Sequence, residues 1–321
     1  MTNFERILGR GLCLLSLSLL FAFASAGVEE TAVVSPPARR VAPLPAMTKR
    51  AVERPKEPLP GESIVLCDSG SNQFTLFLPK GWQAPQSGEI GLTVHFHSAA
   101  WFAIQEHLRH GLKGPLVTAQ LGAASSAYRK PFENPKRFAE WLELVAKTLK
   151  EHGAPANSRI VSLEITSFSA GYGAVRELLK TPEHFKLIRR IVLSDSIYGN
   201  LEKSAGPTQV RVAAPESVAP WIPFVKAAAQ GEKTFVLTHS QVPTPTYASS
   251  GEMAAALIKA VGAPVEKMTP MPPADDPECR LQYRSDLGRF HVWGYAGSDG
   301  QAHMAHLRHL AEVWMAAAGD E

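Results

Sequence analysis

From residue 61 to the C-terminus, short apolar runs alternate with longer segments in which apolar residues recur every three or four positions. The short runs are typical of strands buried on both faces of a sheet, and the longer segments predict amphipathic helices between them. The first two runs flank a turn that contains Gly70 and Asn72, which predicts a hairpin. The predicted strands are 63–70, 73–81, 91–98, 115–122, 159–167, 190–198, 233–242 and 289–297.

The helical segments carry their own start and stop signals. The segment 134–153 has a periodic apolar face and ends at Gly153, and the segment 249–262 begins with a capping-box pair, Ser249 and Glu252, and ends at Gly262. Strands that alternate with helices in this way predict an α/β fold. We expect a doubly wound, mostly parallel eight-stranded sheet with helices on both faces and an antiparallel hairpin at its start.

The first 60 residues lack this alternating pattern of strands and helices. Residues 1–26 combine Arg6 and Arg10, an apolar run over 12–24 and the small residues Ala-Ser-Ala before position 27, which predicts an export signal. The protein is then secreted or periplasmic and has no stable membrane insertion once the signal is cleaved; an uncleaved segment would instead anchor it. Residues 27–60 hold seven prolines and no apolar period, which predicts a linker outside the core. Residues 61–321 are predicted to form one domain.

Composition narrows the classes of partner. The chain has 321 residues, of which 45% are hydrophobic and 20% charged, with a formal net charge of +3 and its basic residues scattered. Nucleic acid is therefore not an expected partner. Outside the predicted signal there are two cysteines, Cys67 and Cys279, for which an oxidising compartment would permit a disulfide.

The segment Ser167-Phe168-Ser169-Ala170-Gly171 follows the fifth predicted strand and precedes a helical pattern. Small residues around Ser169 suit a sharp strand-to-helix turn that exposes a nucleophilic serine, although the bare pattern is common. With this strand and helix context, residues 61–318 resemble an α/β-hydrolase. Ser167 departs from the glycine that the family has at this position, but serine is also small. The alternative interpretation is that Ser169 only caps the following helix.

The resemblance implies a histidine in the loop after the last strand and a carboxylate that orients it. His303 is the first histidine after the glycine-rich loop, and His306 and His309 follow as expected packing or surface residues. No acid precedes Glu252 after the seventh predicted strand, so we expect the acid in the family's other position, after the sixth strand, at Asp195. Asp299 is the rival.

The same resemblance implies an oxyanion site, which needs backbone amides aimed at the substrate oxygen. Ala170 follows the nucleophile, and Ser98 or Ala99 occupies the loop after the third strand. The segment between the sixth and seventh predicted strands is too short for the large lid that many family members insert there, so we expect an open site. An open site with an aromatic rim would suit a small-molecule or saccharide ester, and no cofactor is expected. The candidate substrate-binding residues are His97, Trp101, Tyr172 and Tyr198, with Tyr247 also near a strand end.

The resemblance implies a secreted serine hydrolase that cleaves carboxylic esters through an acyl-enzyme on Ser169. Two other functions remain possible from the sequence. His95 and His97 are two positions apart in a strand and, together with His239, could bind a metal in a metal-dependent hydrolase. A catalytically inactive binding protein could also use the fold, since fold does not fix function. In the family's strand order the first and last strands lie at opposite edges, so we expect no disulfide between Cys67 and Cys279.

Overall fold

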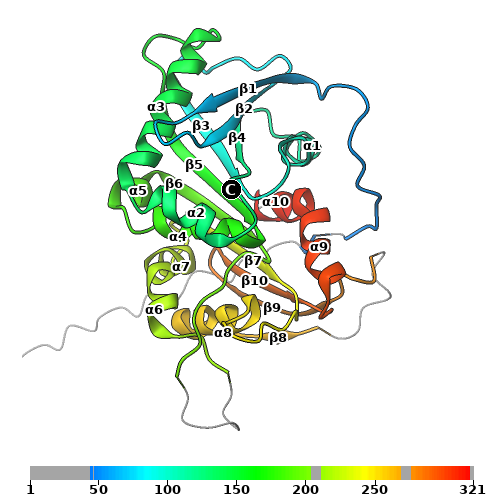
Figure 1. The fold of residues 1–321 in the computed structure, drawn as a ribbon. Coiled ribbons are helices and arrows are strands. Elements are labelled where there is room, and N and C mark those ends of the chain that lie inside the picture. Colours follow the sequence, from blue (N-terminus) through cyan, green and yellow to red (C-terminus); the bar gives the residue numbers. More distant parts are fainter. Residues whose placement is uncertain (1–43, 46, 204–210, 269–275, 319–321) are drawn as a thin grey trace, which may run out of the picture. The chain divides into compact units, whose positions relative to one another are not determined.

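Ten strands form one open sheet within the described part of the chain, in the order β1-β2-β4-β3-β5-β6-β7-β10-β9-β8 (Figure 1). This computed structural model describes residues 44, 45, 47–203, 211–268 and 276–318, all of which belong to the second of two units, Pro37–Glu321. The strands are β1 Gly61–Cys67, β2 Gln73–Pro79, β3 Glu89–Phe96, β4 Leu116–Ala119, β5 Arg159–Phe168, β6 Ile188–Ser194, β7 Thr234–His239, β8 Glu266–Lys267, β9 Leu281–Leu287 and β10 Phe290–Tyr295.

The centre of the sheet is parallel and both edges are antiparallel. In the sheet order, the neighbouring strands β4, β3, β5, β6, β7 and β10 pair in parallel. At the two edges, β1 and β2 form the expected hairpin, and β9 pairs antiparallel to β10. The helices are α1 Ala100–Arg109, α2 Ser125–Phe132, α3 Pro135–Glu151, α4 Tyr172–Leu178, α5 Pro182–Leu187, α6 Pro215–Val218, α7 Ile222–Ala229, α8 Ser250–Val261, α9 Gly300–Arg308 and α10 Leu310–Ala318. The expected α/β class is confirmed.

The central strands are apolar on both faces because helices cover both faces. On β6, Ile191 and Leu193 pack into the core that includes α3, α4, α7 and α8, whereas Val192 packs with Trp293 and Trp314 in the core against α1 and α10. Figure 1 shows α1, α9 and α10 on one side of the sheet and the other helices on the opposite side. This two-sided burial explains the nearly continuous apolar runs.

Two local signals in the sequence are confirmed. Ser249 and Glu252 form a capping box at the start of α8, and Gly262 ends that helix in the left-handed conformation with φ 69°.

Cys67 and Cys279 are both free, as expected. No described helix is long and apolar enough to cross a bilayer.

The expected count of eight strands is wrong, because β8 and β9 were not predicted. The sequence of β9 contains Arg284 and Asp286, which interrupt any apolar run. Both are buried, and Asp286 accepts hydrogen bonds from Arg284, His291 and Trp293. A buried charge is tolerated when partners of this kind satisfy it, and these partners come mainly from the neighbouring strand β10.

The expected linker differs from the structure in its second half. The described residues between 44 and 60 lie along the domain, and Figure 1 shows this coil passing outside α1 toward α9. Leu44, Met47 and Val52 pack against the core formed by β10 and α10, while Arg50 pairs with the buried Glu106 at 2.5 Å. Sparse apolar residues thus anchor a segment whose proline content suggested a free tether. The first half and the expected signal lie outside the described residues.

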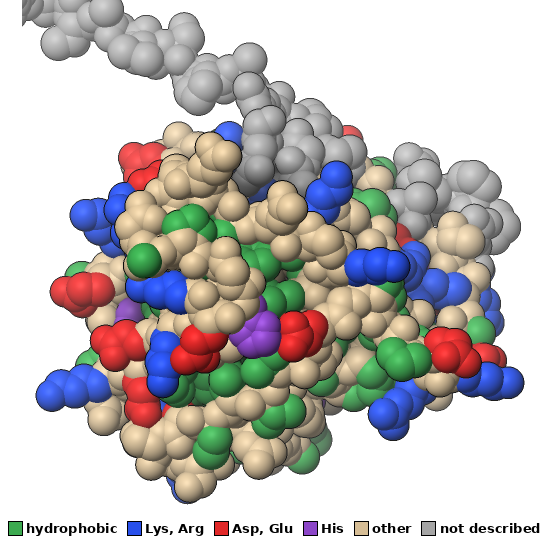
Figure 2. Space-filling view, turned by 90° about the horizontal axis from the view of Figure 1, so that it is seen from above, with side chains coloured by type: hydrophobic (Ala, Val, Ile, Leu, Met, Phe, Trp, Pro, Cys, Tyr) green, Lys and Arg blue, Asp and Glu red, His purple; other side chains and the backbone are tan. Residues whose placement is uncertain are grey.

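Charges of both signs are mixed on the surface. On the face shown in Figure 2, Lys and Arg side chains are interspersed with Asp and Glu side chains. The positive net charge is therefore not gathered into one basic region on this face.

Candidate active site

Three residues in strained backbone conformations lie at the carboxyl ends of three neighbouring strands. His97 follows β3, Ser169 follows β5 and Asp195 follows β6, with φ values of 72°, 48° and 43°. Among the described residues only Ser71 is a further non-glycine residue with positive φ. Such strain persists only where the surroundings enforce it, and it gathers at functional sites.

Close packing enforces the turn at Ser169. A Cβ atom added at Gly171 would lie 2.5 Å from the carbonyl oxygen of Phe96, and one added at Gly173 would lie 2.4 Å from that of Ser125. Both distances are shorter than van der Waals contact, so only glycine fits. The helix after Ser169 can therefore approach β3 and α2 closely, and the serine lies at the carboxyl end of β5.

Ser167, which replaces the family's glycine, has a partner in the structure. Its hydroxyl lies 2.7 Å from the hydroxyl of Ser196, and Ser196 donates to the carbonyl oxygen of Ser169 at 2.9 Å. Since Ser196 has one hydroxyl proton, Ser167 is the donor to Ser196. The departure from the glycine pattern thus links the turn at Ser169 to the segment after β6.

Asp195 and His303 are joined by a hydrogen bond of 2.7 Å between Oδ2 and Nδ1. Asp195 is 1% exposed, and its Oδ2 also accepts from Ser240 at 2.6 Å. Burial by itself would raise the pKa of Asp195, but the hydrogen bond from His303, the nearby His306 and the bond from Ser240 together hold that pKa well below its usual range. The carboxylate is therefore ionised at neutral pH and accepts the Nδ1 proton, which leaves Nε2 of His303 to accept a proton.

The first turns of α9 position His303. Asp299 caps this helix by accepting from the backbone amides of Gln301 and Ala302, both at 3.0 Å, so its carboxylate is engaged away from the imidazole. The ring of Phe168 stacks on the ring of His303 with a centroid distance of 4.6 Å and on that of His97 at 6.0 Å. Phe168 was not expected to support the histidine, because stacking between distant elements leaves no local signal.

The other expected candidates have structural partners. His306 is buried and lies 2.8 Å from the hydroxyl of Thr238, and His309 is buried 2.8 Å from Asp276. Burial lowers the pKa of His306 to about 4, which favours its neutral form. Glu252 caps α8 and pairs with Arg211. None of these groups contacts the Asp195 and His303 pair by a hydrogen bond within the described residues.

A cavity of about 610 Å³ brings Ser169 and His303 together. Three tyrosines lie next to one another on its wall. The ring centroids are 5.4 Å apart for Tyr172 and Tyr198 and 5.8 Å apart for Tyr198 and Tyr247. The described lining residues are Ala123, Ala124, Ser125, Ser169, Ala170, Tyr172, Arg176, Tyr198, Gly199, Asn200, Ser217, Val242, Pro243, Thr244, Tyr247, Gly300 and His303. The expected residues Ala170, Tyr172 and Tyr198 are thus on this wall.

Four expected residues lie outside this lining. Ser98 and Ala99 follow His97 in the loop after β3, and Trp101 packs edge-on against Phe102 in α1. His97 Nδ1 lies 2.8 Å from the hydroxyl of Tyr128. Segment 123–125, which leads into α2, lines the cavity, and the sequence shows no signal for this position.

The three histidines considered for a metal site do not converge. His95 hydrogen bonds to Thr166 at 2.8 Å and lies against Trp314, whereas His97 is turned toward Tyr128 by its positive φ. His239 is bonded to Tyr283 and to the carbonyl of Ser240. Within the described residues no three His, Cys, Asp or Glu side chains are grouped as metal ligands.

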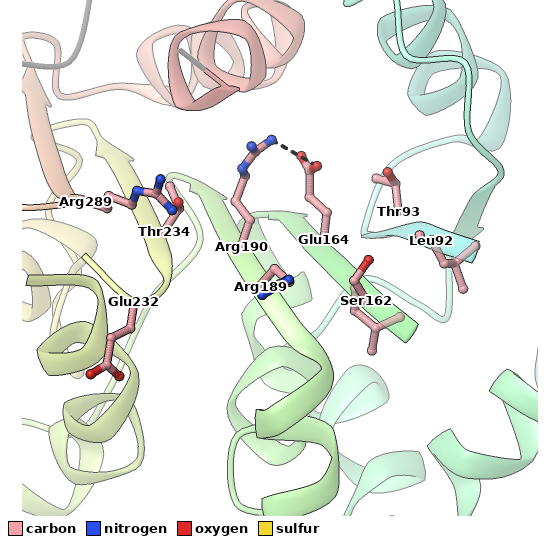
Figure 3. A pocket seen from close by; sticks show the side chains of 11 residues that line it. Leu92, Thr93, Ser162, Glu164, Arg189, Arg190, Glu232, Thr234 and Arg289 are labelled. Atoms are coloured by element: carbon pink, nitrogen blue, oxygen red, sulfur yellow. Dashed lines mark hydrogen bonds and ion pairs between the residues drawn. The ribbon is translucent and has the colours of Figure 1, made fainter. Parts of the chain in front are cut away.

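A second cavity, of about 510 Å³, lies at the amino ends of the central strands. Figure 3 shows Glu164 of β5 and Arg190 of β6 pointing toward one another, with an ion pair of 3.1 Å, whereas Arg289 lies next to Thr234; Arg189 also lines this cavity. It contains neither Ser169 nor His303, because those residues are at the opposite ends of the strands.

Comparisons with known proteins found similar chains among solved structures. No family model matches the chain, and no curated protein does. Solved structures that are similar include a poly(3-hydroxybutyrate) depolymerase from Bordetella parapertussis, with 13% identity, TM-score 0.43 and coverage of 80% of this chain and 89% of that one. A feruloyl esterase module from Clostridium thermocellum has 10% identity, TM-score 0.47 and coverage of 86% and 95%. A siderophore hydrolase from Aspergillus nidulans has 13% identity, TM-score 0.42 and coverage of 82% and 96%.

The strand order, with β4 between β2 and β3, is combined here with a strained serine immediately after β5. The protein has the α/β-hydrolase fold. The candidate residues Ser169, Asp195 and His303 follow one another in the chain order that α/β-hydrolases have for nucleophile, acid and histidine.

Proposed function

We propose that the protein is a serine hydrolase that cleaves carboxylic esters through an acyl-enzyme on Ser169. The observation that carries the proposal is the hydrogen bond between the buried Asp195 carboxylate and His303, next to a strained serine that lines the same cavity. A serine hydroxyl becomes a good nucleophile only when a base removes its proton. This arrangement supplies such a base and orients it.

In the first half of the reaction, Ser169 Oγ attacks the ester carbonyl carbon while Nε2 of His303 takes the hydroxyl proton. Negative charge develops on the carbonyl oxygen, and the backbone amide of Ala170 is the proposed donor to it. The ionised Asp195 stabilises the imidazolium. The tetrahedral intermediate then collapses, the bond to the alcohol oxygen breaks, and His303 returns the proton to the leaving alcohol.

In the second half, His303 removes a proton from water, and the resulting nucleophile attacks the acyl carbon on Ser169. The bond to Ser169 Oγ breaks, His303 protonates the serine, and the carboxylic acid leaves. Ser240 donates a second hydrogen bond to Asp195 at 2.6 Å and thereby holds the carboxylate in one orientation. A fixed carboxylate is needed twice, because the imidazole becomes cationic in both halves.

The cavity supports a small-molecule or saccharide ester as the substrate. The rings of Tyr172, Tyr198 and Tyr247, which contact one another in tilted and edge-to-face arrangements, offer flat apolar surfaces with polar hydroxyls, which suit sugar rings and aryl groups. Serine, threonine and asparagine side chains in the lining provide hydrogen-bonding groups for the remaining polar atoms. Turnover of p-nitrophenyl acyl esters and of acetylated or feruloylated saccharides measures the preference.

The decisive experiment is labelling by a fluorophosphonate, which reacts with an activated serine. The native protein should be labelled at Ser169, and Ser169→Ala should lose both label and ester hydrolysis. Ser162→Ala, at the opposite end of β5, is the matched control and should keep both. A folded Ser169→Ala protein with unchanged turnover would exclude the assignment.

The same measurements separate the two alternatives. An inactive binding protein would show neither label nor turnover. A metal-dependent hydrolase using His95 and His97 would lose activity in EDTA and recover it with zinc. The proposed serine enzyme should keep its activity in EDTA.

A further inference from the structure

One permanently charged side chain lines the cavity that contains Ser169. Apart from His303, the described lining residues are small, aliphatic, aromatic or neutral polar, and Arg176 is the exception. No Asp or Glu is among them. The carboxylate that pairs with Arg176, that of Glu177 at 3.3 Å, is not among the lining residues.

Arg176 is directed toward the reacting serine by its place in α4. It lies four residues after Tyr172 and seven after Ser169, so its Cα is about 10 Å along the helix axis from the serine. Long side chains on a helix lean toward the helix N-terminus, which here is the end at Ser169. Consistent with this direction, the guanidinium carbon of Arg176 is 6.0 Å from the centroid of the Tyr172 ring.

The guanidinium has unused donors. Its Nε donates to Glu177 at 3.3 Å, and that carboxylate is shared with Lys180, whose Nζ is closer at 2.6 Å. The two terminal nitrogens of Arg176 donate no hydrogen bond to another described residue. The Tyr172 ring on one side and Glu177 at Nε limit the orientations of the group and leave its terminal fork for a ligand.

We propose that Arg176 selects ester substrates that carry a carboxylate away from the scissile bond. This inference rests on the proposed ester hydrolysis at Ser169. A guanidinium fork matches a carboxylate with two parallel hydrogen bonds, and Lys cannot reproduce that geometry. The substrate class is therefore a half-ester of a dicarboxylic acid, or an ester whose alcohol part bears a carboxylate.

The test compares esters that differ only in charge. The p-nitrophenyl half-esters of succinate, glutarate and adipate are compared with their methyl-capped neutral forms, and 4-acetoxybenzoate with its methyl ester. The first set places the charge on the acyl side and the second on the alcohol side. The measured quantity is the ratio of kcat/KM for the anionic ester to that for its neutral partner.

The native protein should prefer the anionic ester in one set. Arg176→Gln should reduce that ratio by about tenfold to a hundredfold, mainly through KM, because a charge-assisted bond is lost. Arg176→Lys should restore part of the ratio. The control Arg189→Gln removes the same charge at the other end of the sheet and should leave the ratio unchanged (Figure 3).

The outcomes separate this inference from the proposed function. If the esters are hydrolysed in a Ser169-dependent way but Arg176→Gln and Arg176→Lys both keep the native ratio, the role of Arg176 is wrong and the hydrolase remains. Equal rates for charged and neutral esters in the native protein would also overturn the role of Arg176. If no ester is hydrolysed and fluorophosphonate does not label Ser169, both proposals fail.

Discussion

Ser196 donates its hydroxyl proton to the carbonyl oxygen of Ser169 at 2.9 Å, and it lies 2.7 Å from the hydroxyl of Ser167. One side chain after β6 thus ties together both ends of the strained turn. The turn holds φ at 48° for Ser169, a conformation that a non-glycine residue keeps only when its surroundings enforce it. The segment after β6 therefore positions both the acid and the serine.

We expect Ser196→Ala to lower kcat by about tenfold and to destabilise the fold by about 1–2 kcal/mol, because the Ser169 carbonyl and the Ser167 hydroxyl lose their partner. Ester kinetics and urea unfolding of the same preparation measure the two effects. Ser167→Gly, which restores the family's residue, should have the smaller effect on kcat. A Ser196→Ala protein with native kcat would show that the turn is held by packing alone.

Asp195→Asn should lower kcat by roughly three to four orders of magnitude, because an amide cannot stabilise the imidazolium as the carboxylate does. Asp299→Asn, at the N-terminus of the helix that carries His303, is the matched control. It should have little effect on kcat, since asparagine caps a helix about as well as aspartate. The reverse order of the two effects would place the acid at Asp299.

The buried histidines should make the fold sensitive to acid. Burial, with a smaller contribution from His110, lowers the pKa of His107 to about 4, against the opposing effect of its hydrogen bond to the Gly114 carbonyl. Because the folded pKa is below the unfolded value of about 6.5, the unfolded chain binds a proton first as the pH falls. Stability is then full above pH 6.5 and falls between about pH 6.5 and 4.

This histidine should contribute up to about 1.4 kcal/mol per pH unit in that window. His107→Gln keeps a donor for Gly114 but cannot be protonated, so its free energy of unfolding should fall less steeply from pH 6.5 to pH 4.5. Urea titrations at both pH values give the two slopes. Equal slopes in the two proteins would mean that His107 is not held neutral by the fold.

The N-terminal segment carries a separate prediction. If residues 1–26 are an export signal, the mature protein should begin at Gly27 and should be recovered outside the cytoplasm. Mass spectrometry of the intact mature protein measures its first residue. A full-length chain in the membrane fraction would instead indicate an uncleaved anchor.

Local patterns in the sequence determined the fold class, the hairpin and the capping box of α8. They also pointed to Ser169, because the small residues that permit a sharp turn are neighbours in the chain. The order Ser169, Asp195, His303 could be proposed because each residue directly follows a strand or its loop. These features are readable because the physics that produces them acts over a few residues.

Only the tertiary structure decided which side chains meet. The strand β9 is formed although Arg284 and Asp286 are charged, because His291 and Trp293 of β10 help to satisfy the buried carboxylate. Asp299 caps its own helix, while Asp195 reaches His303 across 108 positions of the chain. Arg176 joins the cavity wall for the same reason. Burial and hydrogen bonding depend on partners brought from distant segments, and a linear pattern does not contain those distances.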